Sequence, residues 1–205
     1  MPVARTQESV SLVIFRLASP DDGEDLQRIY APVVNQTAIS FELLTPTSEE
    51  MGVRVANTLP TYPWIVAVDN ADAGMAGYAY AGAYAAREAY QWSVSVSIYL
   101  SENARGQGLG RRLYGALFAI LAEQGFRQAV AGIALPNDAS VGLHESLGFE
   151  RVGVFQNVGW KFDRWHGVGH WQKPISTALA QPVPTRSVDE LPEGLVVNIL
   201  NKYSK

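Results

Sequence analysis

The sequence predicts an α/β protein with a mixed sheet, and two observations lead to this fold class. Strand-like segments are interleaved with segments of helical period, in the order strand, two helices, three strands, helix, strand, helix and two strands. A glycine-rich stretch in the middle of the chain follows one strand and opens a long helix that leads to the next strand. Because such a crossover joins parallel strands, the sheet is expected to contain parallel as well as antiparallel pairs.

The first part of the chain reads as one strand and two helices. A short apolar run with β-branched members predicts a strand over residues 12–17. Ser19 can cap the helix that follows, and Pro20 suits its first position. A second helix is expected to begin at Ser48 and to stop before Pro60.

The rest of the chain supplies most of the sheet. Residues 91–100 alternate bulky and small polar side chains, which is the two-residue period of a strand. The long helix after the glycine-rich stretch ends near Gly125, and Gly148 can supply the left-handed cap of a shorter helix. The remaining segments are predicted as strands at 64–68, 75–84, 128–135, 150–157 and 161–172 and as a helix at 137–147.

Composition excludes several classes of protein. The chain of 205 residues carries 16 Lys and Arg against 20 Asp and Glu, and this acidic balance argues against nucleic-acid binding. It has no cysteine, which excludes disulfides, thiolate nucleophiles and cysteine-based metal sites. Residues 1–11 lack the pattern of a signal peptide, and no stretch approaches the roughly 20 apolar residues of a membrane span. We therefore expect a cytoplasmic protein.

The strongest chemical signal is the loop from Arg105 to Gly110, which Arg111 and Arg112 follow. Its glycines let successive N–H groups turn toward one anion, and the helix start adds a partial positive charge. A Walker A loop would end in Gly-Lys-Ser/Thr, and a dinucleotide fingerprint would carry a glycine where Arg111 stands. The loop thus predicts a binding site for a pyrophosphate group, carried by a ligand of neither of these two classes. A plain surface turn is the alternative.

The pattern Arg-x-x-Gly-x-Gly at this point in the element order resembles the acetyl-CoA loop of the GNAT superfamily of N-acetyltransferases. Two blocks, Leu135-Pro136-Asn137-Asp138 and the stretch from Trp165 to Gln172, resemble the phosphinothricin and methionine sulfoximine N-acetyltransferases in particular. The resemblance runs from about residue 12 to residue 173. It implies a GNAT-like fold, with a central mixed sheet of about seven strands flanked by about four helices.

The same resemblance implies that acetyl-CoA is the cosubstrate. The glycine loop would hold its pyrophosphate, the strand before the loop would pair with the pantetheine arm, and the start of the later helix would add contacts. Plain helix capping is the alternative for Asn137, since asparagine is a favoured cap. The implied cofactor-binding residues are Ile98, Tyr99, Leu100, Arg105, Gly106, Gln107, Gly108, Leu109, Gly110, Arg111, Asn137 and Ser140.

Two positions are candidates for catalysis. His144 lies two helical turns after Asn137, and an imidazole can accept or relay a proton near neutral pH. A structural histidine packed against the sheet is the alternative. Ser95 occupies the place where the subfamily usually carries a glutamate that is a candidate general base. A serine cannot act as a base near pH 7, so the role would pass to His144 or to ordered water.

Four residues are candidates for binding the amine substrate. By resemblance, Arg87 would grip an α-carboxylate through a bidentate pair, and Phe41 would form a wall of the side-chain pocket. An exposed loop arginine and a core or dimer-contact phenylalanine are the alternatives. Tyr80 and Trp92 could add further wall, although aromatic residues on strands more often belong to the core.

The function implied is transfer of an acetyl group from acetyl-CoA to the amine of phosphinothricin, methionine sulfoximine or methionine sulfone, which would detoxify such compounds. Attack would be direct, in a ternary complex, because no cysteine can carry the acetyl group. Another small amine, a polyamine or a protein N-terminus stays open as acceptor, as does a weakly catalytic acyl-CoA-binding protein. We expect a homodimer with no nucleic-acid or membrane partner, and we assign no metal site.

Composition changes after residue 175, so we divide the chain into a GNAT domain at 1–175 and a C-terminal extension at 176–205. Three prolines interrupt this extension, and residues 195–200 form a short apolar patch. A disordered tail is one interpretation. Docking on the domain or on a partner through the apolar patch is the other.

Overall fold

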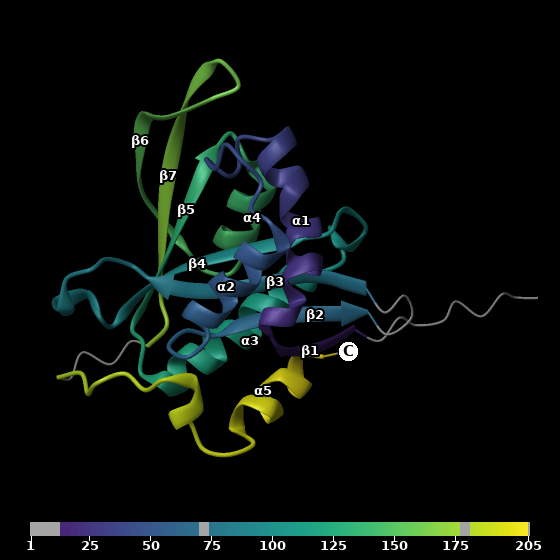
Figure 1. Ribbon diagram of the computed structural model, residues 1–205. Coiled ribbons are helices and arrows are strands. Elements are labelled where there is room, and N and C mark those ends of the chain that lie inside the picture. Colours follow the sequence, from purple (N-terminus) through teal and green to yellow (C-terminus); the bar gives the residue numbers. More distant parts are fainter. Residues whose placement is uncertain (1–12, 70–73, 177–180, 205) are drawn as a thin grey trace, which may run out of the picture.

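The computed structural model describes residues 13–69, 74–176 and 181–204. Its strands form a single seven-stranded sheet in the order β1-β2-β3-β4-β5-β7-β6 (Figure 1). Their bounds are Val13–Leu17 (β1), Trp64–Asp69 (β2), Gly74–Ala83 (β3), Ser93–Leu100 (β4), Gln128–Leu135 (β5), Glu150–Lys161 (β6) and Arg164–Pro174 (β7). The α-helices are Gly23–Gln36 (α1), Ser48–Thr58 (α2), Leu109–Gln124 (α3), Asp138–Ser146 (α4) and Leu195–Tyr203 (α5).

The sheet has two antiparallel parts that meet in a parallel pair. β1 to β4 follow one another as antiparallel neighbours, and β5, β7 and β6 form a second antiparallel group. β4 and β5 join the two parts as the parallel pair that the α3 crossover requires. The mixed α/β fold and the GNAT-like arrangement are confirmed, with five α-helices where about four were expected.

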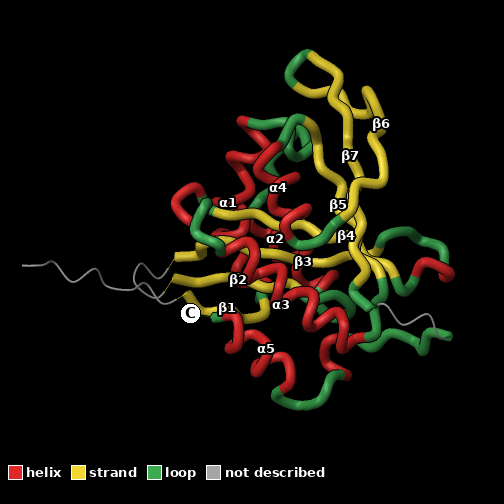
Figure 2. The backbone as a smooth tube through the Cα atoms, turned by 180° about the vertical axis from the view of Figure 1, so that it is seen from behind, coloured by secondary structure: helices red, strands yellow, loops and turns green. Residues whose placement is uncertain are grey.

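Helices cover both faces of the sheet because its central strands are apolar on both sides. In β2, Trp64 and Val66 belong to a core with α1 and α2, whereas Ile65 and Ala67 belong to a core with α3. α1 and α2 therefore lie on one face (Figure 1). α3 lies on the other face, which Figure 2 shows from behind.

β6 is longer than predicted, β7 begins and ends later than predicted, and the expected break at residues 158–160 is wrong. β6 continues past Asn157, where a positive φ of 53° accompanies a register shift between Phe155 and Gly159. The turn comes later, at Phe162 and Asp163, both with positive φ as in a type I′ hairpin. The bulge therefore bends the strand instead of ending it. The long hairpin projects beyond the rest of the sheet (Figure 1).

The described part of the C-terminal extension docks on the domain. α5 packs against α3 and β1, and Leu200 and Leu191 are buried beside them. The hydroxyl of Ser204 accepts a hydrogen bond of 2.8 Å from the main-chain N–H of Phe15. Of the two interpretations of this segment, docking through its apolar residues is the one that the structure supports for residues 181–204.

The packing of α5 gives a stability test. Leu200→Ala is expected to lower the free energy of unfolding by about 2–5 kcal/mol, since it leaves a cavity beneath α5. Val197→Ala on the same helix is the matched control, because Val197 is 57% exposed whereas Leu200 is 4% exposed. Urea unfolding followed by circular dichroism measures both. Equal values for the two variants would contradict the docking of α5.

Candidate active site between β4 and β5

The site begins where β4 and β5 separate. In the described sheet, the pairs between these strands cover only Ser93–Ser95 against Gln128–Val130. β4 then continues to Leu100 along β3, while β5 continues to Leu135 along β7. The edge of β4 that faces β5 therefore keeps main-chain donors and acceptors that the β4–β5 ladder does not use.

A cavity of about 60 Å³ occupies the gap between the diverging strands. It brings together five of the predicted site residues, which come from two different elements, with neighbours from β5, α3 and the loop after α1. The residues that line it are Ile39, Val96, Ser97, Ile98, Tyr99, Tyr114, Ala131, Gly132, Ile133, Ala134, Asn137, Ser140 and His144. The predicted members are Ile98, Tyr99, Asn137, Ser140 and His144.

The glycine loop between β4 and α3 presents a free helix start. Gly106 and Gly108 have φ of 74° and 76°, a left-handed conformation that glycine adopts without strain. Gly108 is the N-cap of α3 and has no side chain that could accept from the first helical N–H groups. Uncapped amides and the dipole of a 16-residue helix are the features that the predicted anion seat requires.

The polar side chains of the loop brace it from outside. Arg105 donates through Nε and Nη2 to the Leu100 carbonyl at 3.4 Å, and Gln107 donates to the Asn103 carbonyl at 2.6 Å. Arg111 donates to the Ser146 carbonyl at the end of α4. The guanidinium of Arg112 lies over the Phe15 ring and donates to the Tyr203 carbonyl, so this side chain packs against β1 and the C-terminal end of α5.

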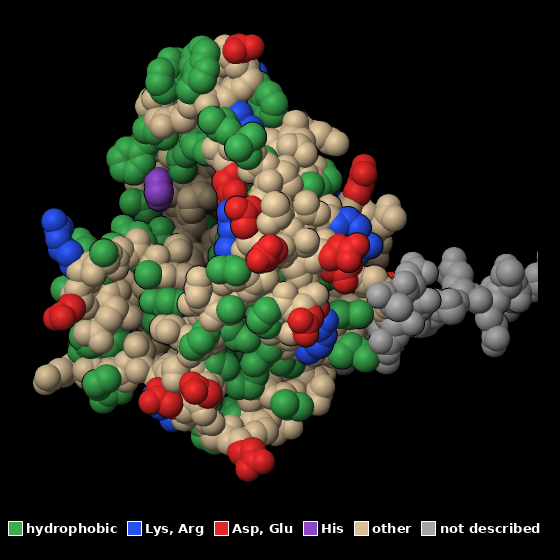
Figure 3. Space-filling view, in the orientation of Figure 1, with side chains coloured by type: hydrophobic (Ala, Val, Ile, Leu, Met, Phe, Trp, Pro, Cys, Tyr) green, Lys and Arg blue, Asp and Glu red, His purple; other side chains and the backbone are tan. Residues whose placement is uncertain are grey.

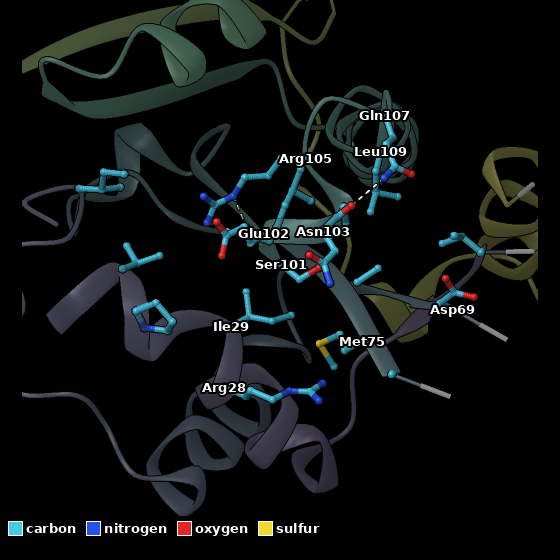
Figure 4. A pocket seen from close by; sticks show the side chains of 18 of the residues that line it. Arg28, Ile29, Asp69, Met75, Ser101, Glu102, Asn103, Arg105, Gln107 and Leu109 are labelled. Atoms are coloured by element: carbon cyan, nitrogen blue, oxygen red, sulfur yellow. Dashed lines mark hydrogen bonds between the residues drawn. The ribbon is translucent and has the colours of Figure 1, made fainter. Parts of the chain in front are cut away.

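A larger hollow of about 640 Å³ lies between α1 and the loop. Figure 4 shows Arg28 and Ile29 from α1 on one side of it, and Glu102 and Arg105 from the loop on the other. Neither Asn137 nor His144 lines this hollow, whereas both line the smaller cavity. The smaller cavity is therefore the candidate active site, and it shares Ile39 with the hollow.

His144 is buried, with 3% of its surface exposed, and both ring nitrogens are engaged. Nδ1 lies 2.7 Å from the Ser140 carbonyl, which can only accept, so Nδ1 carries the proton. Nε2 then accepts from the hydroxyl of Tyr114 at 3.0 Å. Burial lowers the pKa of His144 below its usual 6.5, although the Ser140 carbonyl opposes this shift. The imidazole is consequently a neutral proton acceptor at pH 7.

Tyr114 is the site residue that the sequence did not reveal. It lies on the apolar face of α3, where its period marks it as core, and it is indeed fully buried. Its burial raises the pKa of the phenol well above the usual value of 10, so the hydroxyl keeps its proton. Only the placement of His144 on α4 shows that this hydroxyl is part of a polar pair lining the cavity.

The structure shows the capping role of Asn137 and leaves the pantetheine contact a prediction. Its side chain caps α4 by accepting from the Ser140 N–H at 3.2 Å, and it also lines the cavity. Ser95 lies at the last paired position before the strands separate, which is the apex of the gap. Its hydroxyl turns toward β3 and lies 3.3 and 3.2 Å from the carbonyls of Gly82 and Ala83.

The four predicted substrate residues occupy different places. Tyr80 stacks on Trp64 with ring centroids 4.2 Å apart, within the aromatic core below α1. Trp92 donates through Nε1 to the Val183 carbonyl of the C-terminal extension. Arg87 is exposed in the β3–β4 connection and lines neither of the two cavities described above. Phe41 is half-buried, two residues after Ile39 of the cavity wall.

Two broader properties follow from the described residues. No group of three or more His, Asp or Glu side chains among them is placed to hold a metal ion together. None of their helices has both the length and the apolar character needed to cross a bilayer.

Comparison with known proteins agrees with this geometry. Residues 15–167 match the family model described as an acetyltransferase (GNAT) domain. The phosphinothricin N-acetyltransferase of Streptomyces viridochromogenes is 37% identical over 158 residues, which cover 77% of this chain and 85% of the relative. A methionine sulfoximine/methionine sulfone acetyltransferase of Pseudomonas paraeruginosa is 38% identical over 150 residues, or 73% of this chain and 87% of the relative.

A solved structure extends the agreement to three dimensions. It is a GNAT phosphinothricin acetyltransferase from Sinorhizobium meliloti in complex with acetyl-CoA, with a TM-score of 0.78 and 33% sequence identity. The match covers 89% of this chain and 97% of that one. The chain therefore belongs to the GNAT acetyltransferase family.

Proposed function

We propose that this protein transfers an acetyl group from acetyl-CoA to the α-amine of a small amino-acid analogue, with phosphinothricin, methionine sulfoximine and methionine sulfone as the first candidates. The observation that carries the proposal is the cavity where β4 and β5 separate, which Ile98 and Tyr99 of β4 line together with the His144–Tyr114 pair. The glycine loop follows directly after β4. The names of two relatives, a phosphinothricin N-acetyltransferase and a methionine sulfoximine/methionine sulfone acetyltransferase, support this class of acceptor.

The residues around the gap fit acetyl-CoA. The N-terminal amides of α3 would hold its pyrophosphate, since they are uncapped donors at the positive end of a helix. The edge of β4 from Ile98 to Leu100 would pair with the pantetheine arm, and Asn137 and Ser140 would flank that arm. When bound, acetyl-CoA supplies an acyl group activated as a thioester. The free N–H groups of β4 are donors available to its acyl oxygen.

Proton transfer would pass through the Tyr114–His144 pair. The attacking amine must be neutral, so its proton needs an acceptor. Ser95 cannot serve as a base, while the neutral His144 holds a lone pair on Nε2 toward Tyr114. A proton delivered to the Tyr114 hydroxyl can displace the phenol proton to His144. The reverse path can return a proton to a departing thiolate.

Attack would be direct, in a ternary complex, because the chain has no cysteine that could accept the acetyl group. Holding both reactants in one cleft removes much of the entropic barrier. We place the reaction in the cytoplasm, in keeping with acetyl-CoA as the donor.

The proposal includes a homodimer. The projecting β6–β7 hairpin carries the exposed apolar side chains Val152, Phe155, Val158, Trp160, Phe162 and Trp165. Hydrophobic side chains gather over this end of the molecule in Figure 3. β6 is also an outer strand of the sheet. A contiguous apolar patch on an edge is suited to a twofold contact between identical chains.

A different small amine is the second candidate acceptor. It is favoured by the exposure of Arg87 and by a serine in place of the glutamate at position 95. Acetyl-CoA turnover with a panel of free amines distinguishes the candidates. We expect turnover on methionine sulfoximine, methionine sulfone or phosphinothricin to exceed that on polyamines and peptide N-termini. Turnover confined to the latter amines would support the second candidate, and binding without turnover would contradict both.

The anion seat can be tested with two matched glycines. Gly108→Ala is expected to weaken acetyl-CoA binding by at least about tenfold, because a methyl group there tilts the donor amides. Gly194→Ala is the control, since Gly194 is the N-cap of α5 with φ of 75° and equally open surroundings. Both variants should lose a similar stability, about 1–2 kcal/mol, from the strained alanine. Calorimetric titration with acetyl-CoA measures the affinity. Equal affinities in the two variants would contradict the seat.

His144→Ala is expected to lower kcat by at least about tenfold, as a lost proton acceptor should. Because burial lowers the pKa of His144, wild-type kcat should fall only below pH 6.5, as the imidazole becomes protonated. The variant should lose this acidic limb. Steady-state rates between pH 5 and pH 9 at saturating acetyl-CoA are the measurement, with His170→Ala, on β7 and outside the cavity, as the control. A variant with normal kcat would show that His144 is structural.

A further inference from the structure

The ammonium of Lys161 is buried at the tip of the β6–β7 hairpin, and the two carbonyls that it contacts are far away in sequence. Lys161 is 5% exposed, and its Nζ donates to the Val34 carbonyl at 2.6 Å and to the Ser40 carbonyl at 2.8 Å. The Phe162 ring lies 5.2 Å from the same nitrogen. The three N–H groups thus face two carbonyls and an aromatic ring.

Burying an ammonium costs desolvation free energy, which interactions with the neighbouring groups must offset. Burial lowers the pKa of Lys161, and only the more distant Glu42 carboxylate opposes the shift. Glu42 is itself held by Arg54 in a bidentate ion pair. Val34 lies in the last turn of α1, where the negative end of the helix dipole stabilises a cation bound to the carbonyls. Lys161 therefore acts as a C-terminal cap supplied by another element.

The second carbonyl that Lys161 contacts, that of Ser40, belongs to a segment beside the candidate active site. Ser40 lies between Ile39, which lines the catalytic cavity, and Phe41, the predicted wall of the amine pocket. Ser40 is buried, and its hydroxyl is hydrogen-bonded to Tyr30 at 2.7 Å. A bond to the Ser40 carbonyl thus fixes the main chain between both neighbours.

The hairpin holds Phe41 at two further points. The Phe41 ring packs so closely on Gly159 that a Cβ there would overlap it. On the other side, the Phe41 and His166 rings have centroids 6.1 Å apart. His166 is buried and donates through Nε2 to the Lys161 carbonyl at 2.9 Å. Gly159, Lys161 and His166 together form a clamp on the segment from Ile39 to Phe41.

We propose that Lys161 is a positioning residue for the amine substrate, because its ammonium ties the segment from Ile39 to Phe41 to the hairpin and so fixes one wall of the cavity. The inference rests on the proposed acetyl transfer and assigns no contact between Lys161 and substrate. Acetyl-CoA would lie on the other side of the gap, along β4 and the start of α3. Loss of the clamp should therefore affect the amine and spare the cofactor.

Lys161→Met tests this, because methionine keeps most of the aliphatic stem and removes the donors. We expect the KM for the preferred amine to rise about tenfold, while kcat and acetyl-CoA affinity stay close to wild type. Hydrogen exchange of the amides at 37–42 should become faster, with no change in α3. Lys202→Met, the same replacement at an exposed site on α5, is the control and should change none of these.

Gly159→Ala keeps the lysine and displaces the Phe41 ring, so it tests the clamp even where Lys161→Met folds poorly. It should raise the KM for the amine in the same way and leave acetyl-CoA binding intact. If both variants resemble Lys202→Met, or if they lower kcat and acetyl-CoA affinity together, the positioning role is overturned. A wild-type protein that acetylates no amine would instead refute the proposed function, and the inference would fail with it.

Discussion

The parting of β4 from β5 is the constraint on which the rest of this molecule depends. Two parallel strands that stay paired would use their main-chain groups on each other and leave no room between them. Here three residue pairs hold the strands together before they diverge. β3 and β7 secure the outer edges of β4 and β5, so the gap does not cost the sheet its integrity. The inner edge of β4, Tyr114 of α3 and Asn137 at the start of α4 then all line the same space.

The chemistry that we propose for the site follows from uncapped main-chain donors and from one buried hydrogen-bonded pair of side chains. The first amides of α3 have no side-chain cap, and the glycine conformation before them keeps that end open. The Tyr114 hydroxyl and His144 Nε2 are hydrogen-bonded to each other in the buried wall of the cavity. Burial keeps the imidazole neutral and the phenol protonated, which is the pair of states that a proton relay requires. These features need no charged residue in the cavity.

Much of the fold could be predicted from period and turn residues, because the two faces of the sheet are both apolar and both covered. The glycine loop could also be predicted, because closely spaced glycines between a strand and a helix are typical of a phosphate-binding loop. Tyr114 could not be found, because a buried tyrosine on a helix has the same period as any core residue. The hairpin bounds were missed at Asn157, where a bulge resembles a turn in sequence. The role of Lys161 could not be predicted, because the carbonyls that it contacts lie more than a hundred residues away in the sequence.

The hydrogen bond between Ser204 and Phe15 has a consequence for how this protein tolerates shortening. β1 is the outermost strand on its side of the sheet, and the N–H of Phe15 is one of its outward-facing groups. α5 shields that margin together with the serine hydroxyl. A chain that ended before α5 would present a bare strand margin and the apolar flank of α3 to its neighbours. Because a bare edge strand can pair with strands of other molecules, we expect a chain shortened in this way to aggregate more readily.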